Sequence, residues 1–279
     1  QKCPEGVCTG GWGLSLCAES LAKFAQFMLD EGRWQGRQLL GAWYIRQMSQ
    51  CQILIHTPGR KQPEQFGYQV WVEGEQGIYS GVGAFGQAYV VFPEQQAVAV
   101  LLGGSMQYLR ALQILRKKFP RAVGQGDADA AAERELAQGA PSWQEPLAAR
   151  YAGREYALAP NDLGLTAIRF WFGEQDEVEI QMGRRSSRLP IGYGAFLRGK
   201  MPIRENEFMD VHNQLVFSAA ACSGAWQEGK YHLRIAYTEQ CYLSDFEIEF
   251  APHGIRISCG RNVGFVQSAN LPILGYQKQ

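Results

Sequence analysis

The chain has 279 residues, of which 46% are hydrophobic and 12% aromatic, and this composition excludes a disordered tail. A chain of this length folds as one large domain or two smaller ones, and either buries a sizeable core. Lys and Arg together number 27, as do Asp and Glu, so the formal net charge is zero. No overall field attracts nucleic acid or an anionic membrane, and we expect neither as a partner. The longest apolar run, 97–102, is too short to cross a bilayer.

Seven cysteines form an odd set without dense spacing, at positions 3, 8, 17, 51, 222, 241 and 259. A chain of this length does not need a disulfide scaffold, so we expect buried, reduced thiols. Cys3 and Cys8 are close enough in sequence to pair or share a metal, but no C-x-x-C pair exists and the four histidines lie far apart. We therefore expect no metal and no organic cofactor. The cysteine usage favours a reducing compartment such as the cytoplasm.

The first 120 residues alternate between helical and strand-like patterns. Residues 18–30 carry apolar side chains at helical spacing, and Gly32 is suited to end that helix. Two further helices are expected, over 42–49 and 106–118. Strands are expected over 66–72, from 77 to 79 onward, over 88–92 and over 97–102.

The composition changes after this half. Residues 120–141 are rich in alanine, glycine and charge, and only 128–136 has a helical pattern, so we expect a linker here. Short strands separated by turn residues follow, over 155–158, 165–172, 177–182, 215–221, 231–237, 242–250 and 255–259. Seven strands with no convincing helix favour a sandwich or a closed antiparallel barrel. The predicted fold class is α+β, in two domains.

A glycine-punctuated turn occupies residues 80–87, Ser-Gly-Val-Gly-Ala-Phe-Gly-Gln, and runs directly into the strands 88–92 and 97–102. Glycines let a backbone come close to a ligand, with N–H groups that point at an anion or a polarised carbonyl. The turn therefore suggests an oxyanion or substrate-binding edge. The alternative is an ordinary strand connection, in which the glycines only relieve steric strain.

Three segments in order resemble the β-lactamase-like serine hydrolases, which include class C β-lactamases, penicillin-binding-protein-like esterases and related amidases. Residues 10–24 resemble the family's glycine-rich approach and its T-A-x-D-L-A-K-F helix, and residues 32–40 resemble its G-x-W-x-G-K-Q-I-L turn. Residues 79–103 resemble its final hairpin, with G-x-F-G-Q leading into a P-E turn. Only the three segments together, in this order, are specific.

The resemblance continues past the linker. Residues 151–156 and 161–165 resemble the start of a β-barrel domain that is often appended to these hydrolases, and 223–226 and 262–265 have counterparts there. The resemblance thus covers nearly all of this chain but only the later part of the family's length. It implies the C-terminal part of a β-lactamase-like α/β domain over 1–120, a linker over 121–147 and an antiparallel, lipocalin-like β-barrel over 148–279.

The family's chemistry is acyl transfer, in which a serine in S-x-x-K attacks a carbonyl while the lysine and a tyrosine move protons. The resemblance implies that these three residues lie upstream of Gln1, so that the chain holds no catalytic residue of its own. It also implies an oxyanion and substrate strand formed by Tyr79, Ser80, Gly81, Val82, Gly83, Ala84 and Gln87. The family often has K-T-G in this strand, whereas this chain has no lysine there. Depending on the alignment, the oxyanion donor is the N–H of Ala84 or that of Val82, and strand alternation puts both on one face.

Two serines match catalytic motifs by letters alone. Ser20 and Lys23 match S-x-x-K, but they lie in an amphipathic helix, in the family's non-catalytic D-L-A-K-F position. Ser268 and Asn270 match S-x-N near the end of the other domain, where chance is the better explanation.

The second half also offers aromatic residues and a basic turn. The aromatic residues are expected to fill the barrel core, with a ligand pocket as the alternative; they include Trp171, Phe170, Tyr193, Trp226, Tyr231 and Tyr237. Arg184, Arg185 and Arg188 suit an anion, but a solvated turn is the simpler interpretation.

We therefore expect a fragment of a serine hydrolase that cleaves amide or ester bonds of a small-molecule or peptide-like substrate and is inactive alone. The alternatives are a non-enzymatic binding module built on the β-barrel, a fragment complemented by a separate nucleophile-bearing chain, and an enzyme that uses Ser20 or Ser80 itself. If half of the α/β domain is absent, a sheet edge and apolar helix faces are exposed, which predicts a homodimer through that edge.

Overall fold

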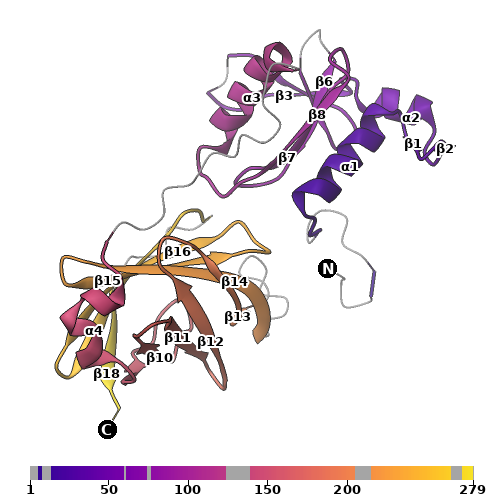
Figure 1. Ribbon diagram of the computed structural model, residues 1–279. Coiled ribbons are helices and arrows are strands. Elements are labelled where there is room, and N and C mark those ends of the chain that lie inside the picture. The colour runs from indigo at the N-terminus through magenta and orange to yellow at the C-terminus, as the bar shows by residue number, and fades with distance from the viewer. Residues whose placement is uncertain are drawn as a thin grey trace. The chain divides into compact units, whose positions relative to one another are not determined.

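The computed structural model describes residues 6–7, 14–59, 61–73, 77–123, 139–204, 215–264 and 272–278. The protein is a mixed α+β structure, 46% strand and 20% helix, and includes a closed nine-stranded β-barrel. At this level the expected class and the expected barrel are confirmed. The chain divides into two compact units, Gln1–Ala130 (unit 1) and Ala131–Gln279 (unit 2) (Figure 1).

Unit 1 is built on a six-stranded antiparallel sheet in the order β3-β4-β5-β6-β7-β8. Its strands are β3 (Ile53–Ile55), β4 (Glu64–Phe66), β5 (Trp71–Glu73), β6 (Ile78–Val82), β7 (Gln87–Phe92) and β8 (Ala97–Leu102). The order in space follows the order in the chain, so β3 and β8 are the two edges of the sheet. The strands expected over 88–92 and 97–102 are confirmed.

Helices cover both faces of this sheet, as Figure 1 shows. They are α1 (Ala18–Leu29), α2 (Ala42–Met48) and α3 (Tyr108–Ala122). α1 and α2 pack on the face that carries Tyr79 and Val91, whereas α3 packs Leu112 on the face that carries Ile78 and Val90. Because side chains alternate along a strand, neighbouring residues of β6 and of β7 face opposite helices.

Glycine ends α1 as expected, since the N–H of Gly32 donates to the carbonyl of Phe27 (2.9 Å). A small hairpin of β1 (Arg33–Trp34) and β2 (Arg37–Gln38) follows. Both residues of its turn, Gln35 and Gly36, have a positive φ, as a type I′ hairpin requires.

The strand expected over 66–72 is wrong, because the chain turns inside it. The N–H of Gly67 donates to the carbonyl of Val70 (2.8 Å), and Gln69 has a φ of 62°. β4 and β5 therefore lie on either side of this turn and pair with each other. The helix expected over 106–118 is in turn too short, since α3 continues through Pro120 to Ala122. Residues 128–136, expected to be helical, lie outside the described residues.

Unit 2 is a sheet that closes on itself. Its strands are β9 (Glu155–Leu158), β10 (Ala167–Trp171), β11 (Asp176–Met182), β12 (Arg185–Gly192), β13 (Leu197–Arg204), β14 (Leu215–Gln227), β15 (Lys230–Tyr237), β16 (Leu243–Ala251), β17 (Gly254–Arg261) and β18 (Ile273–Gln277). β18 pairs with β9, and a short parallel contact between β12 and β14 completes the ring. β13 pairs with β14 alongside that contact.

The sequence patterns do not predict three of these strands, β12, β13 and β18. β12 begins with Arg-Ser-Ser-Arg and contains Pro190, so its apolar alternation starts late. The expected turn is wrong for Arg185 and Arg188, which lie on β12, although both side chains are exposed to solvent as expected. The guanidinium of Arg188 pairs with Glu177 and lies 3.8 Å from the ring centre of Trp171.

One end of the barrel is covered by residues 139–152, which we call the cap segment. It contains the 3-10 helix η1 (Ser142–Gln144) and the short helix α4 (Pro146–Tyr151). Ala140 and Trp226 exchange two backbone hydrogen bonds of 2.7 and 2.8 Å, and the ring of Tyr151 stacks on Phe250 with centres 5.0 Å apart. The C-terminal end of the expected linker over 121–147 therefore packs on the barrel.

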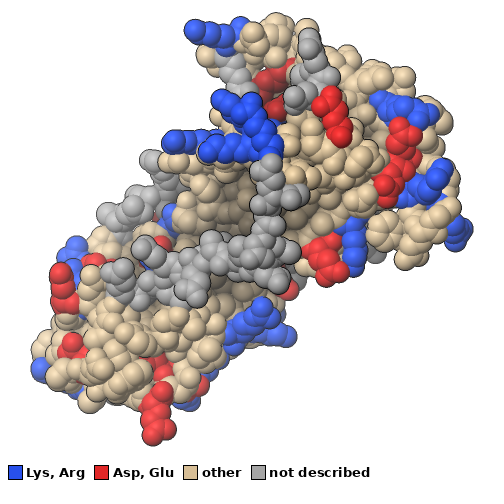
Figure 2. Space-filling model, turned by 45° about the horizontal axis from the view of Figure 1, so that its top comes forward, with Lys and Arg blue, Asp and Glu red and all other residues tan. Residues whose placement is uncertain are grey.

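Charged side chains of both signs lie on the visible face of the molecule (Figure 2), consistent with the formal net charge of zero. Several of them pair across neighbouring barrel strands, such as Lys230 with Glu247 (2.8 Å) and Arg234 with Asp245 (2.6 Å). Within the described ranges, no helix has the length and apolar character that a membrane crossing needs.

Candidate functional site: the β6 edge

The strand that the sequence singles out, β6, ends in a tight turn before β7 begins. The N–H of Gly83 donates to the carbonyl of Gln87 (2.7 Å), and the N–H of Gly86 points back to the carbonyl of Gly83 (3.4 Å). Phe85 has a φ of 64°, which is uncommon for a residue with a side chain. Its ring is only 4% exposed, so packing holds the turn in this conformation.

The directions of the β6 backbone groups follow from this turn. Hydrogen bonding alternates along an antiparallel pair, so every second residue of β6 bonds to β7 and those between face away. Because Gly83 bonds to Gln87, the N–H groups of Ser80 and Val82 point to the opposite side, where β5 lies. Ala84 lies in the turn beyond β6, where this alternation does not apply.

β5 covers only the first part of that side of β6. Trp71, the first residue of β5, lies opposite Ser80. Beyond this point, no described residue accepts a hydrogen bond from the N–H of Val82 or from that of Ala84. The N–H of Val82 thus lies on an open stretch of the β6 edge, and the N–H of Ala84 lies in the turn that follows it. Neither has a described acceptor, so hydrogen bonding does not distinguish between the two candidate donors.

Tyr79 is buried (4% exposed) and faces α1. Its hydroxyl donates to the carbonyl of Met28 (3.0 Å), and burial raises the pKa of the Tyr79 phenol well above its usual value. The phenol therefore keeps its proton at neutral pH. Tyr79 fastens α1 to the sheet and does not supply a base.

Ser80 is fully buried (0% exposed) and faces α3. Its hydroxyl accepts a hydrogen bond from Nη2 of Arg116 (2.5 Å), while Nη1 of the same guanidinium pairs with Glu73. Burial raises the pKa of Glu73 and lowers that of Arg116, and the ion pair opposes both shifts. A guanidinium cannot take a proton from the hydroxyl, so this contact holds Ser80 without activating it.

Gly81 and Gln87 serve packing and register. A Cβ at Gly81 would overlap the ring of Tyr89 on the neighbouring strand, and burial raises the pKa of that phenol to about 12. The side-chain amide of Gln87 donates to the carbonyl of Gly103 (2.9 Å) and ties the start of β7 to the end of β8.

The serines that match catalytic motifs by letters lie elsewhere. Lys23 pairs with Glu19 (2.6 Å) on the exposed side of α1, while the Ser20 hydroxyl lies 3.2 Å from the sulfur of Cys17. Ser268 and Asn270 lie outside the described residues.

Four of the aromatic residues singled out in the barrel lie in its core: Phe170, Trp226, Tyr231 and Tyr237. Phe170, Trp226 and Tyr231 are at most 1% exposed, and their rings contact one another, with centres 5.6 Å apart for Phe170 and Tyr231. Trp171 and Tyr193 lie outside this core.

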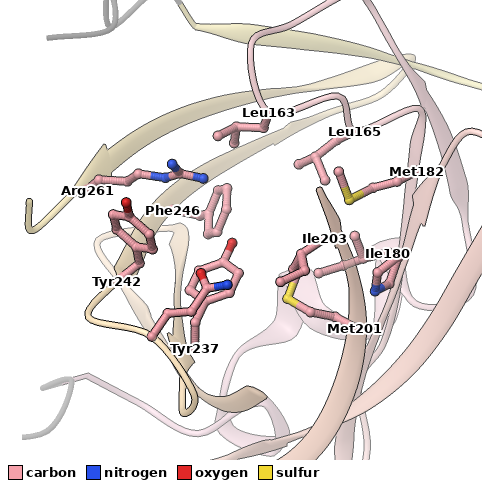
Figure 3. A pocket seen from close by; sticks show the side chains of 12 residues that line it. Leu163, Leu165, Ile180, Met182, Met201, Ile203, Tyr237, Tyr242, Phe246 and Arg261 are labelled. Carbon is pink, nitrogen blue, oxygen red and sulfur yellow. The ribbon is translucent and has the colours of Figure 1, made fainter. Parts of the chain in front are cut away.

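Tyr237 lines a cavity at the end of β15 away from the cap segment. Figure 3 shows Arg261 and Tyr242 on one side of it and Leu165 and Met182 on the other. Its volume is about 30 Å³, which holds on the order of two water molecules. Side chains therefore fill the barrel interior here, and no organic ligand fits without their displacement.

A half-buried carboxyl group, Asp176, connects the cap segment to the barrel. It accepts hydrogen bonds from the hydroxyl of Ser142, from the N–H of Gly173 (3.2 Å) and from the hydroxyl of Tyr231 (3.3 Å). The indole N–H of Trp226 donates to Ser142 (3.0 Å). Burial raises the pKa of Asp176, and the hydrogen bonds oppose that shift.

Sequence reasoning misses Arg116 and Asp176. For Arg116 a signal exists, because this cation interrupts the apolar helical face formed by Leu112 and Phe119. For Asp176 no signal exists, since its partner Ser142 lies in a segment without strand or helix pattern.

Within the described parts of the chain, no group of three or more His, Cys, Asp and Glu side chains is placed to hold a metal ion. No family model, no curated protein and no solved structure matches this chain.

Proposed function

We propose that unit 1 supplies the oxyanion and substrate-binding strand of a β-lactamase-like serine hydrolase, whose attacking serine lies outside the described residues. The observation that carries this proposal is the end of β6, where the N–H of Val82 and, in the turn that follows, the N–H of Ala84 have no described acceptor. A backbone N–H fixed in advance stabilises the negative charge that develops on a carbonyl oxygen during acyl transfer.

The anchoring of β6 supports the same proposal. Tyr79 fastens one face of the strand to α1, and Ser80 is held on the other face by Arg116. Donors on a strand fixed from both sides need little reorganisation when charge develops, which is the condition for electrostatic stabilisation.

The open edge also suits a substrate. An extended chain that lies beside β6 receives main-chain hydrogen bonds from this side of the strand, in the manner of an added strand. This mode fits a small-molecule or peptide-like amide or ester, and the resemblance of residues 79–103 to the final hairpin of the hydrolases points to the same class.

The attacking group is proposed to come from elsewhere, because of what surrounds the described serines. The Ser80 hydroxyl is bound to a cation, and Ser20 and Lys23 are engaged with Cys17 and Glu19. Acyl transfer needs a hydroxyl beside a group that takes its proton.

Labelling with a fluorophosphonate tests this proposal. We expect the product of the complete gene to be labelled on serine and the 279-residue chain alone to remain unlabelled. Labelling of the chain alone, abolished by Ser20→Ala or Ser80→Ala, would overturn the proposal. An unlabelled complete product would overturn it as well.

A pair of proline variants identifies the oxyanion donor. Val82→Pro and Ala84→Pro each remove one N–H that makes no bond to β7, so the hydrogen bonds between β6 and β7 are kept. In the complete gene product, we expect one variant to lower the rate of acylation by roughly 10²–10³-fold and the other to have little effect. Far-UV circular dichroism controls for folding. Equal rates in both variants and the parent would contradict the assignment of this edge.

A further inference from the structure

β8 is an edge strand of the unit 1 sheet, and no strand among the described residues pairs with its outer side. Its six residues, Ala-Val-Ala-Val-Leu-Leu, carry no charge and no proline, and they pair with β7 without a bulge. Charged residues, prolines and bulges usually protect an edge strand, because its open backbone groups otherwise pair with another chain. The opposite edge, β3, has only three residues.

The backbone groups on the open side of β8 are known from its pairing with β7. The N–H of Gly103 donates to the carbonyl of Gly86 (3.0 Å), and from there every second residue of β8 bonds to β7. Val98, Val100 and Leu102 therefore present their N–H and C=O groups to the open side. Among the described residues, nothing accepts a hydrogen bond from these three N–H groups.

We propose that β8 pairs with β8 of a second copy of this chain, antiparallel and about a two-fold axis at Val100. An axis perpendicular to the sheet keeps α1 of both copies on one face, so only residues of the same face lie opposite each other. In the register centred on Val100, Val98 lies opposite Leu102, and all three outward residues exchange hydrogen bonds. A register centred on Ala99 leaves Leu102 without a partner in β8.

The chemistry of β8 fits its own copy. An uncharged strand opposes no like charges when it pairs with itself. The pairing is isologous: each copy contributes its β8 edge, neither β8 edge remains free, and the assembly stops at a dimer. Exposed apolar side chains lie beside the edge. Leu102 on β8 is 44% exposed, and Phe24 is 42% exposed on α1, the helix that packs on β7 and β8.

This inference does not rest on the acyl-transfer site, which uses the edge of β6 rather than that of β8. A different polypeptide that added a strand to β8 would exclude the second copy. The purified chain would then be a monomer, which is an outcome of the test below.

The experiment compares the 279-residue chain with Val100→Pro by sedimentation velocity, from low to high micromolar concentration. Proline at position 100 removes an N–H that makes no bond to β7, so the monomer keeps its ladder. We expect a dimer for the parent chain and a weakening of dimerisation by at least about tenfold in the variant. Leu54→Lys, on the exposed edge β3, is the matched control and should leave the dimer intact.

Amide hydrogen exchange gives an independent readout that does not depend on how the variant folds. In the parent chain, exchange at the amides of Val98 and Val100 should slow as concentration rises, whereas exchange at Ala99, which bonds to β7, should not change. A chain that is monomeric at all concentrations overturns the proposal. A dimer in which exchange at Val100 is independent of concentration overturns it too.

Discussion

At the scale of single residues, Arg116 shows why an arginine stands in the middle of an apolar helix face. Its planar guanidinium reaches Glu73 with one nitrogen and Ser80 with another. A lysine ammonium is a point charge on a flexible stem and does not span both partners in this way. Arg116 thus joins α3 to two neighbouring strands and fixes the inner face of the proposed oxyanion strand.

Replacement of Arg116 by methionine should destabilise unit 1 by about 2 kcal/mol, because the Ser80 hydroxyl loses its donor and Glu73 its partner. We expect no larger destabilisation, because the Glu73 side chain is 40% exposed and stays hydrated when it loses its partner. Urea unfolding measures the loss. Arg116→Lys keeps the positive charge but not the planar guanidinium that reaches both partners, so it should lower the free energy of unfolding by about half as much. Equal stability of Arg116→Met and the parent chain would show that the contacts with Glu73 and Ser80 contribute nothing.

At the scale of elements, the cap segment closes the barrel through one polar network. Ser142 links the carboxyl group of Asp176 to the indole of Trp226; Ser142 and Trp226 are buried, and Asp176 is half-buried. Even partial removal of a carboxyl group from water makes its charged form costly unless hydrogen bonds compensate for the lost water. The packing of the cap segment on the barrel therefore depends on the protonation state of Asp176.

The sign of this sensitivity follows from the raised pKa of Asp176. The folded barrel binds the proton more tightly than the unfolded chain does, whose carboxyl group titrates near 3.8. The resulting stabilisation is complete below that pH and is lost as the pH rises through the higher folded pKa. The free energy of unfolding of the parent, measured relative to Asp176→Asn, should fall as the pH rises from acid to neutral.

Asp162→Asn is the matched control, because it removes an exposed carboxyl group in the same unit. The difference in the free energy of unfolding between Asp162→Asn and the parent should change little over the same pH range. Parallel pH profiles for Asp176→Asn and the parent chain would refute the role given to this carboxyl group.

Elements with a local pattern could be predicted from the sequence, and those set by partners distant in the chain could not. β15 alternates strictly between buried and half-buried residues, and β7 and β8 are apolar runs bounded by turn residues, so all three were expected. β12 was missed because its first half is polar and its place is fixed by pairing with β11 and β14. The proposed donors at Val82 and Ala84 were expected from the resemblance of residues 79–103 to the final hairpin of the serine hydrolases, whereas the contact of Ser80 with Arg116 depends on a helix residue 36 positions away.

At the scale of the whole molecule, the buried apolar residues fall into separate clusters. One large cluster lies entirely within the barrel of unit 2, and two smaller ones lie on the two faces of the unit 1 sheet. Cooperative unfolding follows the extent of one continuous core. The two clusters of unit 1 lie on opposite faces of one sheet and share its strands β6 and β7, so each unit should unfold as its own cooperative element.

Calorimetry of the full chain tests this expectation, which predicts two transitions. Ile235→Ala empties a fully buried site in the barrel and should lower one transition by on the order of 10 °C while leaving the other unchanged. Val90→Ala, at a fully buried site of the unit 1 sheet, should lower only the other transition, and by less, since a smaller side chain is removed. A single transition that both variants lower would mean that the two cores unfold together. In that case the stability of the proposed oxyanion strand would depend on the barrel as well as on its own helices.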